Sequence, residues 1–371
     1  MILLGAGASK FFGLKTLQDL TADIVEKMKE IGHEKTILEI TDAMKKFGIN
    51  PDFENIYTTL EALSNPLRGI EKNGGLAAYI AFKSNYNIQQ DIKSSKQYEK
   101  VLSDLRELIY KECSISRNAI DIIEKTYDHL FQICDQFEYR NLFHITGGDS
   151  QARQVDIGQT IVTTNYDVAV ELYHRKQERM LANGFKQTSV YSSVLDFTEY
   201  GRNPTRNWLI KLHGSIWQFK MDNGRIIQTF SDPENLPFQL SVGEQMMIYP
   251  VEEKPILQQP YFTFYTLFRD QPWHTLIAIG YSFRDIPVNI AIMDRLNWRP
   301  PPKTKLIVVN PDAENVIRNL PLTKENKEQI IRINEPFRDD AKLFAKIKMA
   351  IDCRDWSDFQ NRFKEVSKDK S

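Results

Sequence analysis

The chain has 371 residues, 42% hydrophobic and 26% charged, a composition typical of an ordinary globular protein. Its 48 lysines and arginines nearly balance 49 aspartates and glutamates, so charge gives no sign of an obligatory nucleic-acid or acidic-membrane partner. The three cysteines lack disulfide or zinc spacing, and no apolar run has signal-peptide or membrane-spanning length. We expect a cytoplasmic protein with reduced thiols, no metal and no membrane contact; direct nucleic-acid binding stays open.

Five short apolar runs each end at a small or polar residue: ILLGAG, TIVTTNYD, NWLIKLHGS, HTLIAIGYS and KLIVVNPD. Runs of this length without polar alternation are typical of strands buried on both faces, as in parallel sheets covered by helices. The predicted fold class is therefore α/β, with a Rossmann-like, mostly parallel sheet. Only Met1 to Leu4 precede the first glycines, so this strand is either abbreviated or begins before the present first residue.

The segment between the first two runs has a different pattern. Residues 17–159 are rich in helical periodicity, as in LQDLTADIVEKMKEI, and predict a large helical insertion. The core would then consist of residues 1–16 and 160–335. Within the core, RIIQTF, SDPENLP and MMIYPVEEKP predict a β-hairpin or irregular excursion. Residues 336–371 predict one or two amphipathic helices as a C-terminal extension.

The first candidate site residues lie in GAGAS, directly after the first strand. Gly5 and Gly7 would let the backbone approach a pyrophosphate, and the following helix would offer N–H groups and the positive end of its dipole. A tight strand-to-helix turn without a ligand explains the same glycines equally well. The loop lacks the lysine of a Walker motif, so a nucleoside-triphosphate P-loop is not expected.

Polar residues also follow the other strands, where open α/β sheets bind ligands. Asn165 could donate and accept hydrogen bonds there, whereas an ionised Asp167 could only accept. The alternative is that they cap the next helix, a reading slightly favoured for Asp167 alone. His213, at a strand end before a glycine, is placed to act as a general base, and the other histidines are interpreted as structural. The later strands contribute Gly280, Ser282, Asp285, Asn310 and Asp312.

The ordered set GAGAS with Thr16, TTNYD, KLHGS, GYSFRD and VVNPD resembles the nucleotide-binding motifs of sirtuin-like proteins, over about residues 1–315. DFENIYTTLEAL resembles the helical insertion of the bacterial sirtuin-like branch. The resemblance implies an NAD-binding core in which Asn165 and His213 are catalytic. The glycine loop would meet the phosphates, Asp167 the nicotinamide ribose and Asn310 the adenosine ribose. The binding residues so implied are Gly5, Ala6, Gly7, Ala8, Ser9, Thr16, Asp167, Gly280, Ser282 and Asn310.

Two departures from the sirtuin pattern speak against protein deacylation. No paired-cysteine zinc ribbon follows the histidine motif, and GLKTLQ stands where a PDFR-like sequence would follow the glycine loop. With water as the acceptor, the resemblance implies an NAD⁺ glycohydrolase that releases nicotinamide and ADP-ribose. It further implies an anti-phage defence effector that forms a homo-oligomer and is controlled by a HerA-type ATPase or another phage-sensing partner.

Two other functions remain open from the sequence. One is a non-hydrolytic NAD or ADP-ribose sensor that reports through the helical insertion. The other is a DNA-processing nuclease subunit, because Asp312 and the pair Glu325-x-Lys327 are residue types that hold Mg²⁺ and stabilise a pentavalent phosphate. The context argues against the nuclease, since Asp312 follows one strand and Glu325 precedes the next.

Overall fold

The computed structural model describes residues 1–64, 91–136, 143–145, 153–155, 158–189, 192–202, 207–221, 224–229, 245–248, 260–271, 273–298 and 304–368. Its central feature is a seven-stranded sheet in the order β14-β13-β12-β1-β4-β8-β5, with every neighbouring pair parallel. The strands are β1 Ile2–Leu4, β4 Thr160–Thr163, β5 Leu181–Ala182, β8 Asn207–Lys211, β12 Thr275–Ile279, β13 Lys305–Val309 and β14 Ile330–Ile333. Without the two-residue β5, this is the strand order of a Rossmann fold, so the predicted α/β fold class is confirmed.

The last residues of the five predicted strands lie in one row across the sheet. Leu4 is paired with Thr163 on one side and with Ile279 on the other. Thr163 is paired in turn with Lys211, and Ile279 with Val309. All five following loops therefore leave the sheet at the same edge. The strand order reverses between β1 and β12, which is where such sheets bind ligands.

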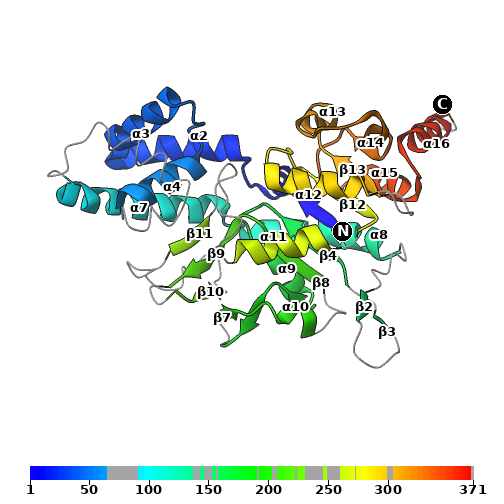
Figure 1. Cartoon of the computed structure of the whole chain (residues 1–371), viewed down its shortest axis with the longest axis horizontal. Helices are drawn as coiled ribbons and strands as arrows, with labels where there is room; N and C mark the ends of the chain where they lie inside the picture. Colours follow the sequence, from blue (N-terminus) through cyan, green and yellow to red (C-terminus); the bar gives the residue numbers. More distant parts are fainter. Residues whose placement is uncertain are drawn as a thin grey trace.

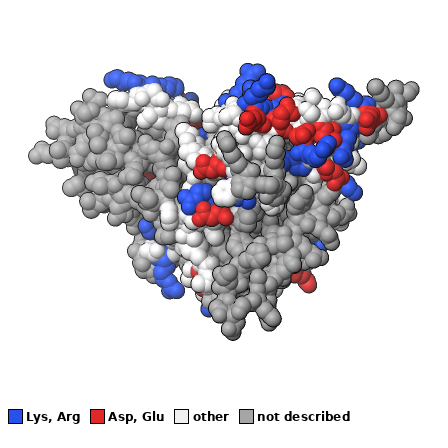
Figure 2. Space-filling view, turned by 45° about the vertical axis from the view of Figure 1, so that its right-hand side comes forward, with Lys and Arg blue, Asp and Glu red and all other residues white. Residues whose placement is uncertain are grey.

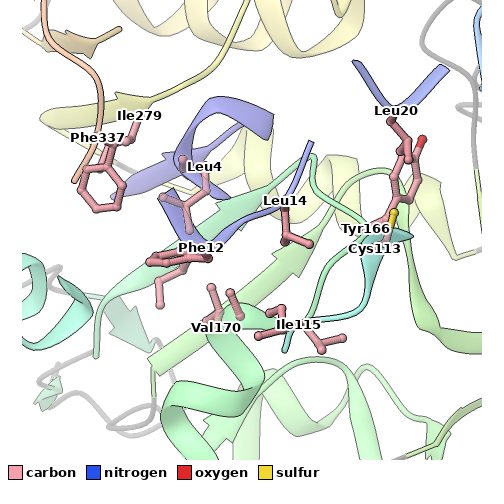
Figure 3. Close-up of a cluster of buried hydrophobic side chains, with 14 of the residues drawn as sticks. Leu4, Phe12, Leu14, Leu20, Cys113, Ile115, Tyr166, Val170, Ile279 and Phe337 are labelled. Carbon is pink, nitrogen blue, oxygen red and sulfur yellow. The ribbon is translucent and has the colours of Figure 1, made fainter. Parts of the chain in front are cut away.

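Helices cover both faces of this sheet, as Figure 1 shows. Alternate strand residues enter two separate apolar clusters, because successive side chains of a strand point to opposite faces. One cluster packs under α11 (Tyr261–Asp270) and α12 (Ile286–Leu296). The other packs under α8 (Arg117–Gln136), α9 (Ala169–Lys176) and α15 (Ala341–Asp352), and part of it is drawn in Figure 3.

The segment between β1 and β4 is mostly helical where it is described, as predicted. In Figure 1, α2, α3, α4 and α7 lie together at the left, whereas α8 lies beside the core. A short hairpin of β2 (Phe143–Ile145) and β3 (Arg153–Val155) follows α8 and was not predicted. The boundaries of core, insertion and extension stay predictions. The segment contains α1 Ala6–Ser9, a 3₁₀ turn Lys10–Phe12, α2 Leu17–Met28, a π-helical turn Lys29–His33, α3 Glu34–Lys46, α4 Phe53–Ser64 and α7 Asp91–Cys113.

A second, antiparallel sheet is larger than the predicted hairpin. Its order is β11-β9-β10-β7-β6, and RIIQTF and MMIYP contribute only two of the five strands. Gly214, at φ +85°, turns the chain out of β8 into this sheet, a change of direction that the continuous apolar run NWLIKLHGSIW conceals. The SDPENLP stretch lies outside the described residues. The strands are β6 Phe185–Gln187, β7 Ser192–Leu195, β9 Gly214–Lys220, β10 Ile226–Thr229 and β11 Gln245–Ile248.

Where the sequence predicts one or two amphipathic helices at the C-terminus, the structure has two, α15 and α16 (Trp356–Lys368). Basic and acidic side chains are interspersed at the upper right of Figure 2, and α16 carries such a pair in Arg362 and Asp358. Within the described part of the chain, no helix is both long and apolar enough to cross a bilayer. The remaining short helices are α10 Glu199–Arg202, α13 Ala313–Val316, a 3₁₀ turn Ile317–Asn319 and α14 Lys324–Glu328.

A buried histidine fixes α9 to the start of β8. The side-chain oxygen of Asn207 accepts from the Gln159 amide at 2.8 Å, so its Nδ2 must face His174 and donate to His174 Nε2 at 3.0 Å. The other ring nitrogen, Nδ1, lies 2.9 Å from the Val170 carbonyl and donates to it. These contacts fix a neutral tautomer. Burial, followed by the nearby Arg179 charge, lowers the pKa of His174 to about 4.

This histidine should destabilise the fold at acid pH. The unfolded chain takes up the proton near the ordinary pKa of about 6.5, whereas the folded chain resists it down to about 4. Stability is therefore complete above the unfolded pKa and falls as the pH drops below it. Between pH 7.5 and 5, wild type should lose about 2 kcal/mol more unfolding free energy than His174→Gln. Urea titrations at both pH values measure this, and equal losses would contradict it.

Candidate active site

The loops after β1 and β12 touch through their backbones at the point where the strand order reverses. The Gly5 amide donates to the Ile279 carbonyl at 2.9 Å, and the Gly7 amide donates to the Gly280 carbonyl at 3.0 Å. A Cβ on Gly280 would lie 2.2 Å from the Ala8 nitrogen, and Gly280 has φ +61°. The tight-turn interpretation therefore explains these glycines directly. Contact with phosphates stays a prediction.

Three side chains from the loops after β1 and β4 form a buried hydrogen-bonded chain. Asn165 Nδ2 donates to the Gly5 carbonyl at 3.0 Å and to Ser9 Oγ at 2.9 Å. Ser9 Oγ in turn donates to Asp167 Oδ2 at 2.7 Å. All three side chains are buried. The two loops are thus joined by side chains that the sequence singled out separately.

The orientation of the Asn165 amide leaves its side-chain oxygen, Oδ1, without a hydrogen-bond donor in the described part of the chain. The Gly5 carbonyl can only accept, so the amide nitrogen must face it and Oδ1 must point elsewhere. Asn165 is 7% exposed, and its Oδ1 has no hydrogen-bond partner among the described residues. Leaving such an oxygen unpaired costs about 1–3 kcal/mol, so an unpaired acceptor of this kind calls for a hydrogen-bond donor such as a water or a bound molecule.

Asp167 also contacts the N-terminus of the next helix, α9. Its Oδ1 accepts from the Ala169 amide at 2.9 Å, at the first residue of α9. Asp167 therefore contacts the start of α9, but the N-cap residue of that helix is Val168. Its backbone carbonyl accepts a hydrogen bond from Lys211 Nζ. The carboxylate is thus held by groups from the glycine loop and α9, and contact of Asp167 with a ribose stays a prediction.

Lys211 and Glu171 form a buried ion pair at 3.2 Å beneath this loop. Burial raises the pKa of Glu171, and the Lys211 charge opposes that shift. Sequence reasoning misses this pair, because Lys211 lies inside the apolar run NWLIKLHGS. A lysine inside an otherwise apolar strand was the available signal, since a buried charge needs a partner.

His213 lies at the corner between the two sheets and pairs with Asp285. His213 Nε2 and Asp285 Oδ2 are 2.7 Å apart, and both residues are buried. Asp285 is also the N-cap of α12, since its Oδ1 accepts from the Val288 amide at 3.2 Å. From the sequence, Asp285 is only a polar residue in the loop after a strand. Only the strand order brings it to a histidine 72 positions away.

Of the remaining predicted residues, some join the loops of the site and others make contacts elsewhere. Asn310 links the loops after β12 and β13, because its Nδ2 donates to the Tyr281 carbonyl at 3.3 Å. Ser282 is half-buried, and its carbonyl accepts from Asn319 Nδ2 at 2.9 Å. Ala6 is half-buried at the start of α1. Thr16 is the N-cap of α2, because its hydroxyl accepts a hydrogen bond from the Asp19 amide, and it also donates to the Asp19 carboxylate at 2.8 Å. Contact of Thr16 with NAD stays a prediction.

The residues of the nuclease alternative lie on the surface. Asp312 is exposed and accepts from Asn315 Nδ2 at 2.7 Å, and Glu325 is exposed in the first turn of α14. In the described part of the molecule, no group of three or more histidine, cysteine, aspartate or glutamate residues could hold a metal ion. The three cysteines are buried and form no disulfide.

Comparison with known proteins agrees with the motif order. Residues 159–332 match the family model of the SIR2-like domain. This range contains every loop described above except the glycine loop after β1. No curated protein matches the chain in sequence.

Two solved structures are distantly similar over most of their length. A mutant Sir2 homologue in complex with 2′-O-acetyl ADP-ribose shares 13% identity, covering 94% of this chain and 89% of that one, with a TM-score of 0.40. A Sir2 homologue in complex with NAD shares 12% identity, covering 94% and 87%, with a TM-score of 0.38. The likeness is too distant to add to the fold assignment that the strand order provides.

The close approach of the two glycine loops can be tested by adding one methyl group. Gly280→Ala should lose roughly 1–3 kcal/mol more unfolding free energy than Gly48→Ala, measured in urea. Both glycines have positive φ, +61° and +72°, but a Cβ on Gly48 meets nothing within 4 Å. The pair therefore separates the clash from the cost of the left-handed backbone. Equal losses would show that the loops tolerate a side chain.

Proposed function

We propose that the chain is an NAD⁺ glycohydrolase, which cleaves the bond between nicotinamide and ribose with water and yields ADP-ribose and nicotinamide. The observation that carries the proposal is the buried, unpaired Asn165 Oδ1 at the edge of the sheet where α/β folds bind ligands. The buried His213–Asp285 pair at the same edge and the match to the SIR2-like domain, whose members are NAD-dependent enzymes, support it.

Loss of nicotinamide develops positive charge at the ribose C1′, so the site must hold the sugar and stabilise an oxocarbenium-like state. Asn165 Oδ1 would accept a hydrogen bond from a ribose hydroxyl or from the attacking water. The hydrogen bonds from its Nδ2 to Gly5 and Ser9 would keep that oxygen in place. Because the amide is already fixed, little reorganisation would be needed in the transition state.

His213 would act as the general base. Its Nε2 is held by the Asp285 carboxylate, so Nδ1 is the nitrogen that would take a proton from water or from a ribose hydroxyl. The buried carboxylate would orient the ring and stabilise the imidazolium that forms. Asp285 would therefore support catalysis through His213 without contacting the substrate.

The cellular role that we propose is NAD depletion in anti-phage defence by a cytoplasmic effector. Uncontrolled NAD cleavage would harm the host cell, so the activity needs a switch, which we place in homo-oligomer assembly and in a separate partner such as a HerA-type ATPase. The C-terminal helices α15 and α16 are the proposed contact surface. This part of the proposal rests on the sequence resemblance.

Nicotinamide release tests the proposed reaction. With NAD as substrate, Asn165→Ala and His213→Gln should each lower kcat by about 10²- to 10⁴-fold. Asp285→Asn should lower it roughly 10- to 10³-fold, because asparagine still caps α12 but cannot stabilise the imidazolium. His129→Gln is the matched control, since His129 also pairs with an aspartate, Asp339 at 2.8 Å, but is exposed. It should leave kcat unchanged.

The assay is run on the purified chain alone and together with the protein encoded beside it. Release that persists in His213→Gln would remove the histidine from the mechanism. If wild type binds NAD but releases no nicotinamide in either setting, the glycohydrolase proposal fails and the NAD-sensor alternative takes its place.

A further inference from the structure

The side chain of Tyr166 connects the loop after β4 to the helical insertion. Tyr166 lies between Asn165 and Asp167 in the loop after β4, and its hydroxyl donates to Glu54 Oε1 at 2.5 Å. Glu54 belongs to the first turn of α4 and is 3% exposed. The ring of the neighbouring Phe53 meets the Tyr166 ring edge-on, with centroids 5.8 Å apart. Figure 3 shows Tyr166 beside Leu20 and Cys113, which belong to α2 and α7 of the insertion.

The same tyrosine also contacts the proposed base. Its ring centroid lies 6.2 Å from that of His213. Its backbone carbonyl accepts from the Ile216 amide at 3.0 Å, two residues into β9. Tyr166 therefore touches the insertion through its hydroxyl, the histidine through its ring and the second sheet through its backbone.

The buried Glu54–Tyr166 bond is built into the fold. The α4 N-terminus is tied to α2, because the Phe53 amide donates to Thr21 Oγ1 at 3.1 Å. A carboxylate in the first turn of a helix is stabilised by the helix dipole. Burial, followed by the Glu54 charge, raises the pKa of Tyr166 well above its ordinary value, so the tyrosine remains a hydrogen-bond donor.

We propose that Glu54 is a positioning residue of the active site, which sets the place of Asn165 and His213 by holding Tyr166 from the insertion. The proposal rests on the glycohydrolase function proposed above. A misplacement of about 1 Å in a catalytic group can lower a rate about 10²-fold, so one buried hydrogen bond is sufficient for a measurable effect. The insertion is then part of the catalytic apparatus, and movement of α4 changes the geometry of the site.

Variants of the two partners test the proposal through kcat. Tyr166→Phe and Glu54→Ala should each lower kcat by roughly 10- to 100-fold with KM changed less than threefold. The double variant should be no slower than the slower single variant, because both remove the same bond. Glu54→Gln keeps an acceptor oxygen and should restore at least part of the rate.

Matched controls come from the same helix. Tyr57 accepts from Arg106 Nε at 3.2 Å, and Glu61 accepts from Arg106 NH2 at 3.4 Å, so both are buried α4 residues paired with α7. Tyr57→Phe and Glu61→Ala should lower the melting temperature as much as their counterparts while leaving kcat near wild type. A purely structural role for Glu54 predicts that all of these variants behave alike.

A second readout does not need activity. The imidazole carbon resonance of His213, assigned among the six histidines by its loss in His213→Gln, should shift in Tyr166→Phe and Glu54→Ala but not in Tyr57→Phe. If the His213 resonance shifts in Tyr166→Phe and Glu54→Ala while the wild-type chain releases no nicotinamide, the positioning role is retained and the glycohydrolase function is rejected. The positioning role would be overturned if the His213 resonance were unchanged in both Tyr166→Phe and Glu54→Ala, or if the losses in kcat were additive in the double variant.

Discussion

The alignment of five strand ends in one row is the constraint on which the rest of the structure depends. Because Leu4, Thr163, Lys211, Ile279 and Val309 are in register, every loop that carries a site residue begins at the same level. The glycines after β1 and β12 then allow the two central loops to touch through their backbones. At the same level Ser9 contacts Asn165 and Asp167, and His213 pairs with Asp285.

The site is held from three directions. Lys211, from β8, binds the Asp167 carbonyl from beneath. Asp285, in the loop after β12, is the N-cap of α12 and pairs with His213. Glu54 reaches Tyr166 from the insertion. Each of these three charged side chains is buried and paired, as desolvated charges must be, and none is among the residues that the motifs indicate as catalytic.

The sequence predicted most of the core sheet, because runs such as TLIAI and KLIVV are continuous and apolar as parallel strands require. It also indicated Asn165, Asp167 and His213 from their places at strand ends. It could not show the second sheet, since Gly214 redirects one apolar run into two sheets. Nor could it pair Asp285 with His213, or Glu54 with Tyr166, because those contacts join residues 72 and 112 positions apart. Thr16, which the resemblance implies as a binding residue, is also the N-cap of α2, and its contact with NAD stays a prediction.

The most direct test of the central claim is a crystal structure of the Asp285→Asn variant with NAD bound, since that variant keeps the helix cap. We expect the nicotinamide ribose at the carboxyl edge of β1, β4 and β8, with one hydroxyl or a water within hydrogen-bonding distance of Asn165 Oδ1 and His213 on the same side. NAD bound elsewhere on the molecule, with Asn165 Oδ1 still unpaired, would contradict the assignment of this edge as the active site.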